Sequence, residues 1–218
     1  KALVELAKEK EDFIVLDADL SLDCRLREFE DTYPERFIEM GIAEQDMVSM
    51  AGGLALQGLL PICHSFANFL AARANEQIYN NNTEKRKILY ACHYAGLIPA
   101  GPGKSHQAVR DISLFGAFTN VAILQACNPA EITQVVRWAV LEAKESVMMR
   151  VNIGPSPRQI SLPESYQLTV GRGIALTEPS DTLVFSYGPV MLNEVLLAAE
   201  GLKQMERAIT VINMPWLN

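Results

Sequence analysis

A glutamate at the start of an apolar helix is the first residue of this sequence that could do chemistry. Glu44 lies in GIAEQDMVSMAGGLALQGLL (41–60), and residues 44 to 57 have the spacing of one amphipathic helix. At 100° per residue, the polar arc consists of Gln45, Asp46, Ser49, Gly53 and Gln57. The apolar arc around Glu44 consists of Met47, Val48, Ala51, Leu54 and Ala55. We therefore expect Glu44 to face the core or a partner, where an acid can share a proton with a heteroaromatic nitrogen of a ligand.

A plainer interpretation of Glu44 is that it complements the helix dipole, which is worth a few tenths to about 1 kcal/mol. That role would suit the polar arc better than the apolar one. Gly52 and Gly53 in the same helix lower its propensity by about 1 kcal/mol each relative to alanine. A closely packed partner helix is the simplest reason for two glycines there.

Two phenylalanines follow the next apolar run, in HSFANFLAARANEQI (64–78). Phe66 and Phe69 stand where a strand should give way to a helix, and ligand sites of open α/β sheets lie outside the carboxyl ends of the strands. The pair could form a flat apolar slot for a planar ring. Ordinary core packing is the competing interpretation, and these residues taken alone favour it.

All three histidines of the chain fall at the same predicted edge. His64 ends one apolar run, His93 ends the next, and His106 lies in the loop AGLIPAGPGKSHQ (95–107). Imidazole transfers protons and recognises hydroxyl groups near neutral pH, so this grouping indicates a ligand site. The loop lacks the GxxxxGK[ST] spacing of a P-loop, which we exclude.

Charge and composition narrow the class of protein. The chain has 19 basic and 26 acidic side chains, a net charge of −7, which argues against a nucleic-acid-binding surface. We find no apolar span of about 18 residues and no charged-then-apolar leader, so we expect neither a membrane protein nor a secreted one. Cys24, Cys63, Cys92 and Cys127 form no CxxC pair, and we expect buried free thiols in a reducing cytoplasm.

The elements that would position these residues alternate along the chain. Stretches with helical periodicity separate β-rich runs, which are FIVLDA, RFIEM, LPICHS, KILYAC, VAILQA, SVMMRV, TLVFSYG and AITVINM. Six of these runs precede residue 152. The alternation predicts an α/β fold with a doubly wound, mainly parallel sheet and helices on both faces.

A change in composition predicts two domains. The segment VNIGPSPRQISLPESYQ (151–167) has three prolines and is typical of a linker. We expect a first domain over residues 1–165 and the beginning of a second α/β domain over residues 166–218. The helical pattern is already under way at residue 1, so we expect the chain to be part of a longer polypeptide.

Several segments together resemble the pyrimidine-binding domain of the transketolase family, whose members use thiamine diphosphate. They are DADL (17–20), RFIEMGIAEQDMVSMAGGLA (36–55), SFANF (65–69), AGL (95–97), GPGKSHQ (101–107) and NPAEI (128–132). The resemblance covers about residues 1 to 165, and residues 171 to 218 resemble the opening of that family's C-terminal domain. GIAEQ and its helix are the most specific part.

The resemblance implies which residues would bind the cofactor. Glu44 would hydrogen-bond a ring nitrogen of the aminopyrimidine and promote the tautomer that deprotonates the thiazolium carbon, which is a catalytic role. Phe66 and Phe69 would pack against the aminopyrimidine ring. Asp19 would lie near the cofactor.

The resemblance also implies a substrate side of the site. His106 would be catalytic and would contact a sugar substrate, and His64 and His93 would contact the same substrate. Arg150 resembles an arginine that binds substrate phosphate in some relatives. No residue of this chain is implied as a metal ligand.

Two departures from the family pattern predict an altered substrate. The loop containing His106 lacks the acidic GEDG that relatives usually carry, so a carboxylate that would contact sugar hydroxyls is missing. Asp23 stands where many transketolases have a serine, and a carboxylate is a poor neighbour for phosphate. A non-phosphorylated or unusual sugar or ketoacid would suit these changes.

The chain also has no GDG followed by an asparagine, the family's diphosphate and metal motif. The resemblance therefore implies that another domain or a separate subunit supplies the diphosphate and Mg²⁺ site. In the family the cofactor spans two chains, so we expect a homodimer, a diphosphate-binding partner subunit, or both.

The leading prediction is the pyrimidine-binding half of a transketolase-like transferase that moves a two-carbon ketol unit between sugars. A decarboxylating relative, such as a deoxyxylulose-phosphate synthase or a ketoacid dehydrogenase β subunit, is the first alternative. A non-catalytic domain of the same fold is the second. Doubly wound sheets carry many functions, so the site residues and not the fold support this choice.

Overall fold

The computed structural model of the chain describes residues 1–98, 100–154 and 156–218. Pro99, in the loop that contains His106, and Pro155, in the predicted linker, lie outside the described residues. The chain divides into two compact units, which we describe separately. The first consists of Lys1–Ile123, Val136–Ile153 and Asn218, and the second of Leu124–Val135 and Gly154–Leu217.

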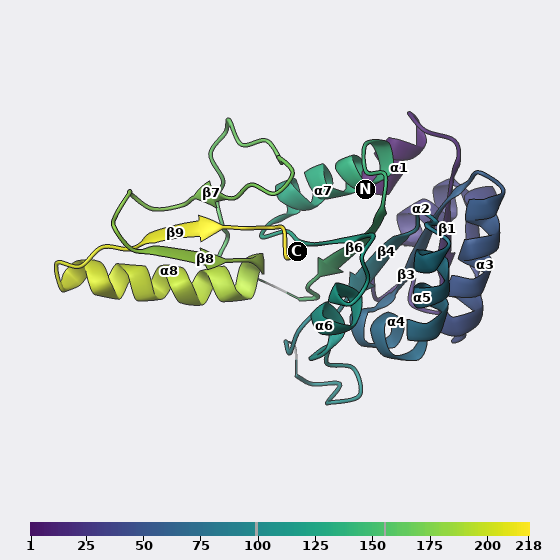
Figure 1. Cartoon of the computed structure of the whole chain (residues 1–218), viewed down its shortest axis with the longest axis horizontal. Coiled ribbons are helices and arrows are strands. Elements are labelled where there is room, and N and C mark those ends of the chain that lie inside the picture. The colour runs from purple at the N-terminus through teal and green to yellow at the C-terminus, as the bar shows by residue number, and fades with distance from the viewer. Residues whose placement is uncertain (99, 155) are drawn as a thin grey trace. The chain divides into compact units, whose positions relative to one another are not determined.

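The first unit is built on a six-stranded sheet with the order β2-β1-β3-β4-β6-β5 (Figure 1). Its strands are β1 (Phe13–Asp17), β2 (Phe37–Glu39), β3 (Leu60–Phe66), β4 (Leu89–His93), β5 (Val121–Gln125) and β6 (Ser146–Val151). The pairings of β1 with β2 and β3, of β3 with β4, and of β4 with β6 are all parallel. Each strand coincides with a predicted run, and the predicted fold class is confirmed.

Helices connect these strands and cover the sheet. They are α1 (Ala2–Ala7), α2 (Arg27–Thr32), the 3-10 helix η1 (Pro34–Arg36), α3 (Glu44–Leu56), α4 (Ala67–Arg73), α5 (Asn75–Thr83), α6 (Asp111–Gly116) and α7 (Pro129–Leu141). Figure 1 shows α3, α4 and α5 on one side of the strands and α1 on the other. All seven residues of β3 are buried, as expected for a strand with cover on both faces.

Helix α3 has the two arcs that its sequence predicts. Its buried residues are Glu44, Met47, Val48, Ala51 and Gly52, whereas all five residues of the predicted polar arc are exposed. Gly52 faces α5, where a Cβ atom would overlap Asn81 Oδ1. Asn81 Nδ2 in turn donates a hydrogen bond of 2.8 Å to the Val48 carbonyl. Close packing against a second helix therefore explains Gly52, while a Cβ at Gly53 would meet open space within 4 Å.

The second unit has a smaller sheet with the order β7-β9-β8. Its elements are β7 (Ile174–Ala175), β8 (Leu183–Ser186), α8 (Gly188–Gln204) and β9 (Thr210–Asn213). Strand β9 pairs parallel with β8 and antiparallel with β7, and α8 lies along β8 and β9 in Figure 1. The runs at β8 and β9 were predicted, but the two-residue β7 was too short for periodicity to indicate.

A buried glutamate joins the segments of the second unit. Glu131 Oε1 accepts hydrogen bonds from the Tyr166 hydroxyl at 2.6 Å and from Asn213 Nδ2 at 2.8 Å. Its other oxygen accepts a bond of 2.7 Å from the backbone N–H of Cys127. Since Glu131 is fully buried, these three donors supply the pairing that a desolvated carboxylate requires.

None of the helices within the described residues is both long and apolar enough to cross a membrane.

The packing at Gly52 predicts opposite effects for two neighbouring substitutions. Gly52→Ala should lower the free energy of unfolding by about 1–2 kcal/mol, because overpacking against Asn81 exceeds the gain in helix propensity. Gly53→Ala should raise it by up to about 1 kcal/mol, because the new methyl group meets no neighbour. Urea unfolding of both variants measures the difference, and equal midpoints would contradict the packing at Gly52.

The Glu131 contacts predict a large loss of stability in the second unit. Glu131→Ala would leave three buried donors without an acceptor, at about 1–3 kcal/mol each, so unfolding should become easier by at least about 3 kcal/mol. Glu142→Ala, at an exposed position just after α7, is the control and should stay within about 0.5 kcal/mol of the parent chain. Denaturant unfolding followed by tryptophan fluorescence provides the measurement.

Candidate active site

An aromatic cluster lies where strands β3 and β4 end. Phe66 and Phe69 pack with their ring centroids 5.5 Å apart, and Phe66 lies 5.4 Å from Tyr94. His106 is edge-on to both phenylalanines, at 5.9 Å from Phe66 and 5.2 Å from Phe69. The loop residue His106 and the two predicted phenylalanines therefore come together, with Tyr94 as a fourth ring.

Glu44 is connected to this cluster through an arginine. The residue is 3 % exposed at the first position of α3, and its Oε1 accepts a 2.9 Å hydrogen bond from Arg73 Nη1. The Arg73 guanidinium also lies over the Phe69 ring, 3.8 Å from its centroid. One planar cation thus contacts both the buried acid and an aromatic face, and its side chain remains 46 % exposed.

A second group of polar side chains is buried between β1, β3 and β4. His64 Nδ1 lies 3.0 Å from Asp17 Oδ1, and His64 Nε2 lies 2.7 Å from His93 Nε2. Burial lowers the pKa of His64 to about 3 and holds the pKa of His93 well below its usual value, so both rings are neutral at neutral pH. The contact between Asp17 and His64 is therefore a hydrogen bond to a neutral ring.

Glu39 extends the group formed by Asp17, His64 and His93, because the Asp17 and Glu39 carboxyls influence each other's titration. Burial raises the pKa of both carboxyl groups. Glu39 Oε1 also accepts bonds from the backbone N–H groups of Asp19, at 3.0 Å, and Gly41, at 2.6 Å. These bonds hold Asp19 in a left-handed conformation (φ 58°) with an exposed side chain, at the start of the loop after β1.

Arg150 forms a buried ion pair on β6. Its side chain is 5 % exposed on β6, and its Nε donates a 2.7 Å bond to Asp111 Oδ2. Asp111 is buried as well, so the pair is a desolvated ion pair. A phosphate-binding role for Arg150 stays a prediction, and it requires this pair to open.

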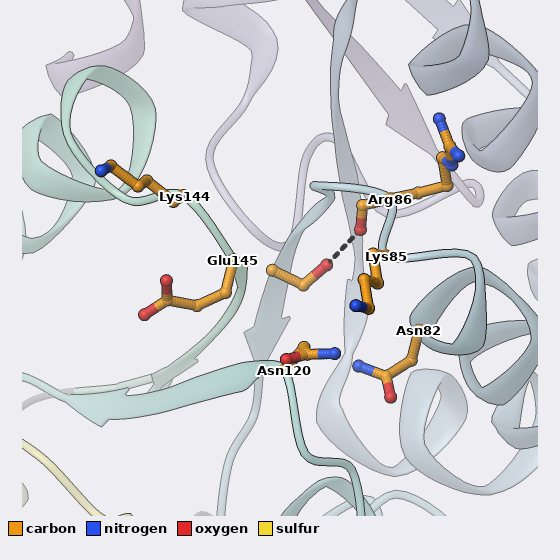
Figure 2. Close-up of a pocket in the computed structure, with 7 residues that line it drawn as sticks. Asn82, Lys85, Arg86, Asn120, Lys144 and Glu145 are labelled. Carbon is orange, nitrogen blue, oxygen red and sulfur yellow. Dashed lines mark hydrogen bonds between the residues drawn. The ribbon is translucent and has the colours of Figure 1, made fainter.

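A separate hollow lies at the opposite, amino-terminal edge of the sheet. Figure 2 shows its lining, which comes from segments just before β4, β5 and β6: Asn82, Lys85, Arg86, Asn120, Lys144, Glu145 and Ser146. Ser146 Oγ closes one side by donating a 2.8 Å bond to the Arg86 carbonyl. The predicted site residues are not among this lining, and ligands of open α/β sheets bind at the other edge.

A comparison with protein-family models assigns most of the chain to one family. Residues 1–152 match the model of the transketolase pyrimidine-binding domain. The chain belongs to the transketolase family. That family is thiamine diphosphate-dependent, and its members include transketolases and deoxyxylulose-phosphate synthases.

Individual relatives of this transketolase domain differ in length and activity. A solved "Split gene transketolase, inactive beta4 tetramer" is 34% identical, with a TM-score of 0.86 over 99% of this chain and 69% of its own. A Methanocaldococcus jannaschii protein described as a transketolase C-terminal section is 31% identical over 98% of this chain and 67% of its own length. The 1-deoxy-D-xylulose-5-phosphate synthase of Listeria innocua is 28% identical over 97% of this chain, which spans 33% of the synthase.

The residues present are compatible with the aminopyrimidine part of the predicted cofactor. The Arg73 guanidinium lies on Phe69 and donates to Glu44 at the same time, so one planar group reaches both the buried acid and the aromatic face. An aminopyrimidine is also planar and carries a ring nitrogen that can share a proton with a carboxyl. A ring in the place of Arg73 would be within reach of the same acid and the same aromatic face.

Asp17 and Arg73 were not predicted as site residues from the sequence. Asp17 looked like a strand residue, and its histidine partner lies on another strand. The contact of Arg73 with Phe69 could have been predicted from the sequence. Arg73 follows Phe69 by four residues on α4, and residues at that spacing meet on a helix surface. An arginine at that spacing from an aromatic ring is positioned for a cation–π contact.

The Glu44–Arg73 contact predicts coupled effects on stability. A double-mutant cycle with Glu44→Gln and Arg73→Met should give a coupling energy of about 1 kcal/mol, at the low end for contacting residues because Arg73 is half exposed. Urea unfolding of the four chains at neutral pH measures it. The exposed pair Arg137 and Glu9 provides the control cycle and should couple more weakly, whereas equal coupling would mean that burial of Glu44 does not strengthen its pair.

Proposed function

We propose that this chain is the pyrimidine-binding half of a thiamine diphosphate-dependent transferase that moves a two-carbon ketol unit between sugars. The observation that carries the proposal is the buried Glu44 carboxyl, which Arg73 connects to the face of Phe69. Burial of an acid next to an aromatic face suits recognition of a planar, basic heterocycle. Membership of a thiamine diphosphate-dependent family supports the aminopyrimidine as that heterocycle.

Each side chain at the carboxyl edge has a role in this proposal. Thiamine diphosphate, when bound, supplies a thiazolium carbon that adds to the substrate carbonyl and stabilises negative charge there. Glu44 holds a proton at the pyrimidine nitrogen, and Phe66 and Phe69 orient the ring by packing against it. Asp19 lies near the cofactor from the loop after β1.

The histidines form the substrate side. His106 is half-buried beside Phe66 and Phe69, where its ring can donate to or accept from a hydroxyl or carbonyl group of the substrate. His93 presents a neutral ring at the end of β4, and His64 orients it through the 2.7 Å contact between their Nε2 atoms. Direct contact of His64 with substrate would require movement, because this ring is 1 % exposed.

The rest of the cofactor site belongs to another domain or subunit in this proposal. A diphosphate-binding partner would supply the oxygen ligands for Mg²⁺ and the diphosphate. That partner would be another domain or a separate subunit, and this chain would also form a homodimer, or either arrangement alone would complete the assembly. Residues 1–165 would form the pyrimidine-binding domain, residues 166–218 would begin the C-terminal domain, and the enzyme would act in carbohydrate metabolism in the cytoplasm.

Substitution of Glu44 tests the central role. In the assembled enzyme with thiamine diphosphate and Mg²⁺, Glu44→Gln should slow hydrogen–deuterium exchange at the thiazolium carbon by roughly 10²–10⁴-fold, because the amide cannot exchange a proton with the ring nitrogen. Quenched-flow labelling read by NMR measures the exchange rate. Circular dichroism should be unchanged.

A neighbouring acid provides the control. Asp46 lies in the same first turn of α3 but on its exposed arc, so Asp46→Asn should leave the exchange rate within a few-fold of the parent. A normal exchange rate in Glu44→Gln, with the cofactor bound, would remove Glu44 from the chemistry.

A decarboxylating relative is the second candidate, and the 28% identity to the Listeria innocua synthase favours keeping it. Donor choice separates the two activities. Labelled carbon dioxide released from pyruvate by the assembled enzyme would support the decarboxylating reaction. Transfer of a two-carbon unit from a ketose without gas release would support the ketol transferase, and heat of cofactor binding with neither reaction would support a non-catalytic domain.

A further inference from the structure

Three side chains with metal-ligating atoms converge at the carboxyl edge of the sheet. His64 comes from β3 and His93 from the end of β4, the neighbouring parallel strand, while Cys24 comes from the segment between β1 and α2. A ligand atom of each residue lies within 4.8 Å of a ligand atom of the other two. Two imidazoles and a thiol are the donors that zinc prefers among protein side chains.

The orientation of His64 matches that of a metal-bound histidine. Its Nδ1 is 3.0 Å from the Asp17 carboxyl, which leaves Nε2 as the ligand atom. Asp17 Oδ2 accepts a 2.7 Å bond from the backbone N–H of Leu20, so the carboxyl itself is held in place. Metal-binding histidines usually donate their second ring N–H to such a carboxylate, which fixes the ring and the tautomer.

The distances allow an ion between the three groups after a small movement. With Zn–N near 2.0–2.1 Å and Zn–S near 2.3 Å, tetrahedral ligand atoms stand roughly 3.3–3.6 Å apart. The two Nε2 atoms are 2.7 Å apart, so they would have to separate by about 0.6 Å, which rotation of one side chain supplies. The Cys24 sulfur lies within 4.8 Å of the ligand atoms of both histidines, so an ion between the two rings would be within its reach.

We propose that Cys24, His64 and His93 bind one divalent transition-metal ion, with Zn²⁺ as the expected ion and Asp17 as the residue that orients His64. The donor set excludes the Mg²⁺ of the predicted diphosphate site, which requires oxygen ligands. When the ion binds, the Cys24 thiol gives its proton to solvent and the sulfur becomes a thiolate ligand.

Three protein ligands leave a fourth position for water or for an oxygen of a substrate, as in catalytic zinc sites. Cys24 packs against Phe66 and Tyr94, so the ion would lie beside the aromatic cluster. An ion there could polarise a substrate carbonyl. Binding of the ion itself does not rest on the proposed function.

Cobalt binding tests the site in the natural full-length chain, stripped with chelator and free of thiamine diphosphate. Co²⁺ should bind with one ion per chain and give both the visible bands of a tetrahedral ion and a thiolate charge-transfer band. Added Zn²⁺ should displace it. Absence of the charge-transfer band, or affinity no better than that of unrelated surface sites, would overturn the proposal.

Matched variants identify the ligands. Cys24→Ser should remove the charge-transfer band, whereas Cys127→Ser, which changes another buried free thiol, should keep it. Asp17→Asn should weaken binding roughly 10–100-fold while keeping the band, because the sulfur ligand remains. An unchanged spectrum in Cys24→Ser would overturn the site.

Circular dichroism shows whether each variant is folded, and a second set of variants replaces any that is not. If Cys24→Ser is unfolded, Cys24→Ala repeats its test. If Asp17→Asn is unfolded, His93→Gln at the half-buried end of β4 should weaken binding at least as much, and unaltered affinity there would overturn the assignment.

Discussion

Pairing of buried charge is the constraint on which this site depends. A carboxylate that leaves water without a partner costs several kcal/mol, so each buried acid must find a donor nearby. Three acids are buried at or near the carboxyl edge of the first sheet: Glu44, Asp17 and Asp111. Their partners, in the same order, are Arg73, His64 and Arg150. Each pair joins segments that are distant in sequence, which fixes the side chains where ligands of such sheets bind.

The fold was predictable because its signals are local. Each strand of the first sheet overlaps a short β-rich run of the sequence, with bounds that differ by one or two residues, and β3 is buried along its whole length. Helix α3 was predictable to the level of single side chains, since helical period alone assigned Glu44 to the buried arc. The two-residue β7 carries no such period, and its pairing with β9 depends on tertiary structure.

The site was predictable only in part, because its contacts are not local. Sequence placed all three histidines at one edge, but they belong to two groups: His106 joins the aromatic rings, whereas His64 and His93 contact each other. Nothing within the DADL segment indicates that Asp17 would meet a histidine 47 positions later. Cys24 likewise looked like an ordinary buried thiol, since a lone cysteine becomes informative only when its neighbours in space are known.

Arg73 explains how the chain tolerates a buried acid at a ligand site. Its guanidinium donates a hydrogen bond to Glu44 and packs on the Phe69 ring. The buried carboxyl therefore has a hydrogen-bond partner within the chain itself. The arginine side chain is 46 % exposed, and its charge can therefore return to water at small cost. In the proposed function, a planar heterocycle that takes its place would restore both contacts, a hydrogen bond with the acid and packing on the ring. The direction of the hydrogen bond would change, because Arg73 donates to Glu44 whereas Glu44 would hold a proton at the ring nitrogen.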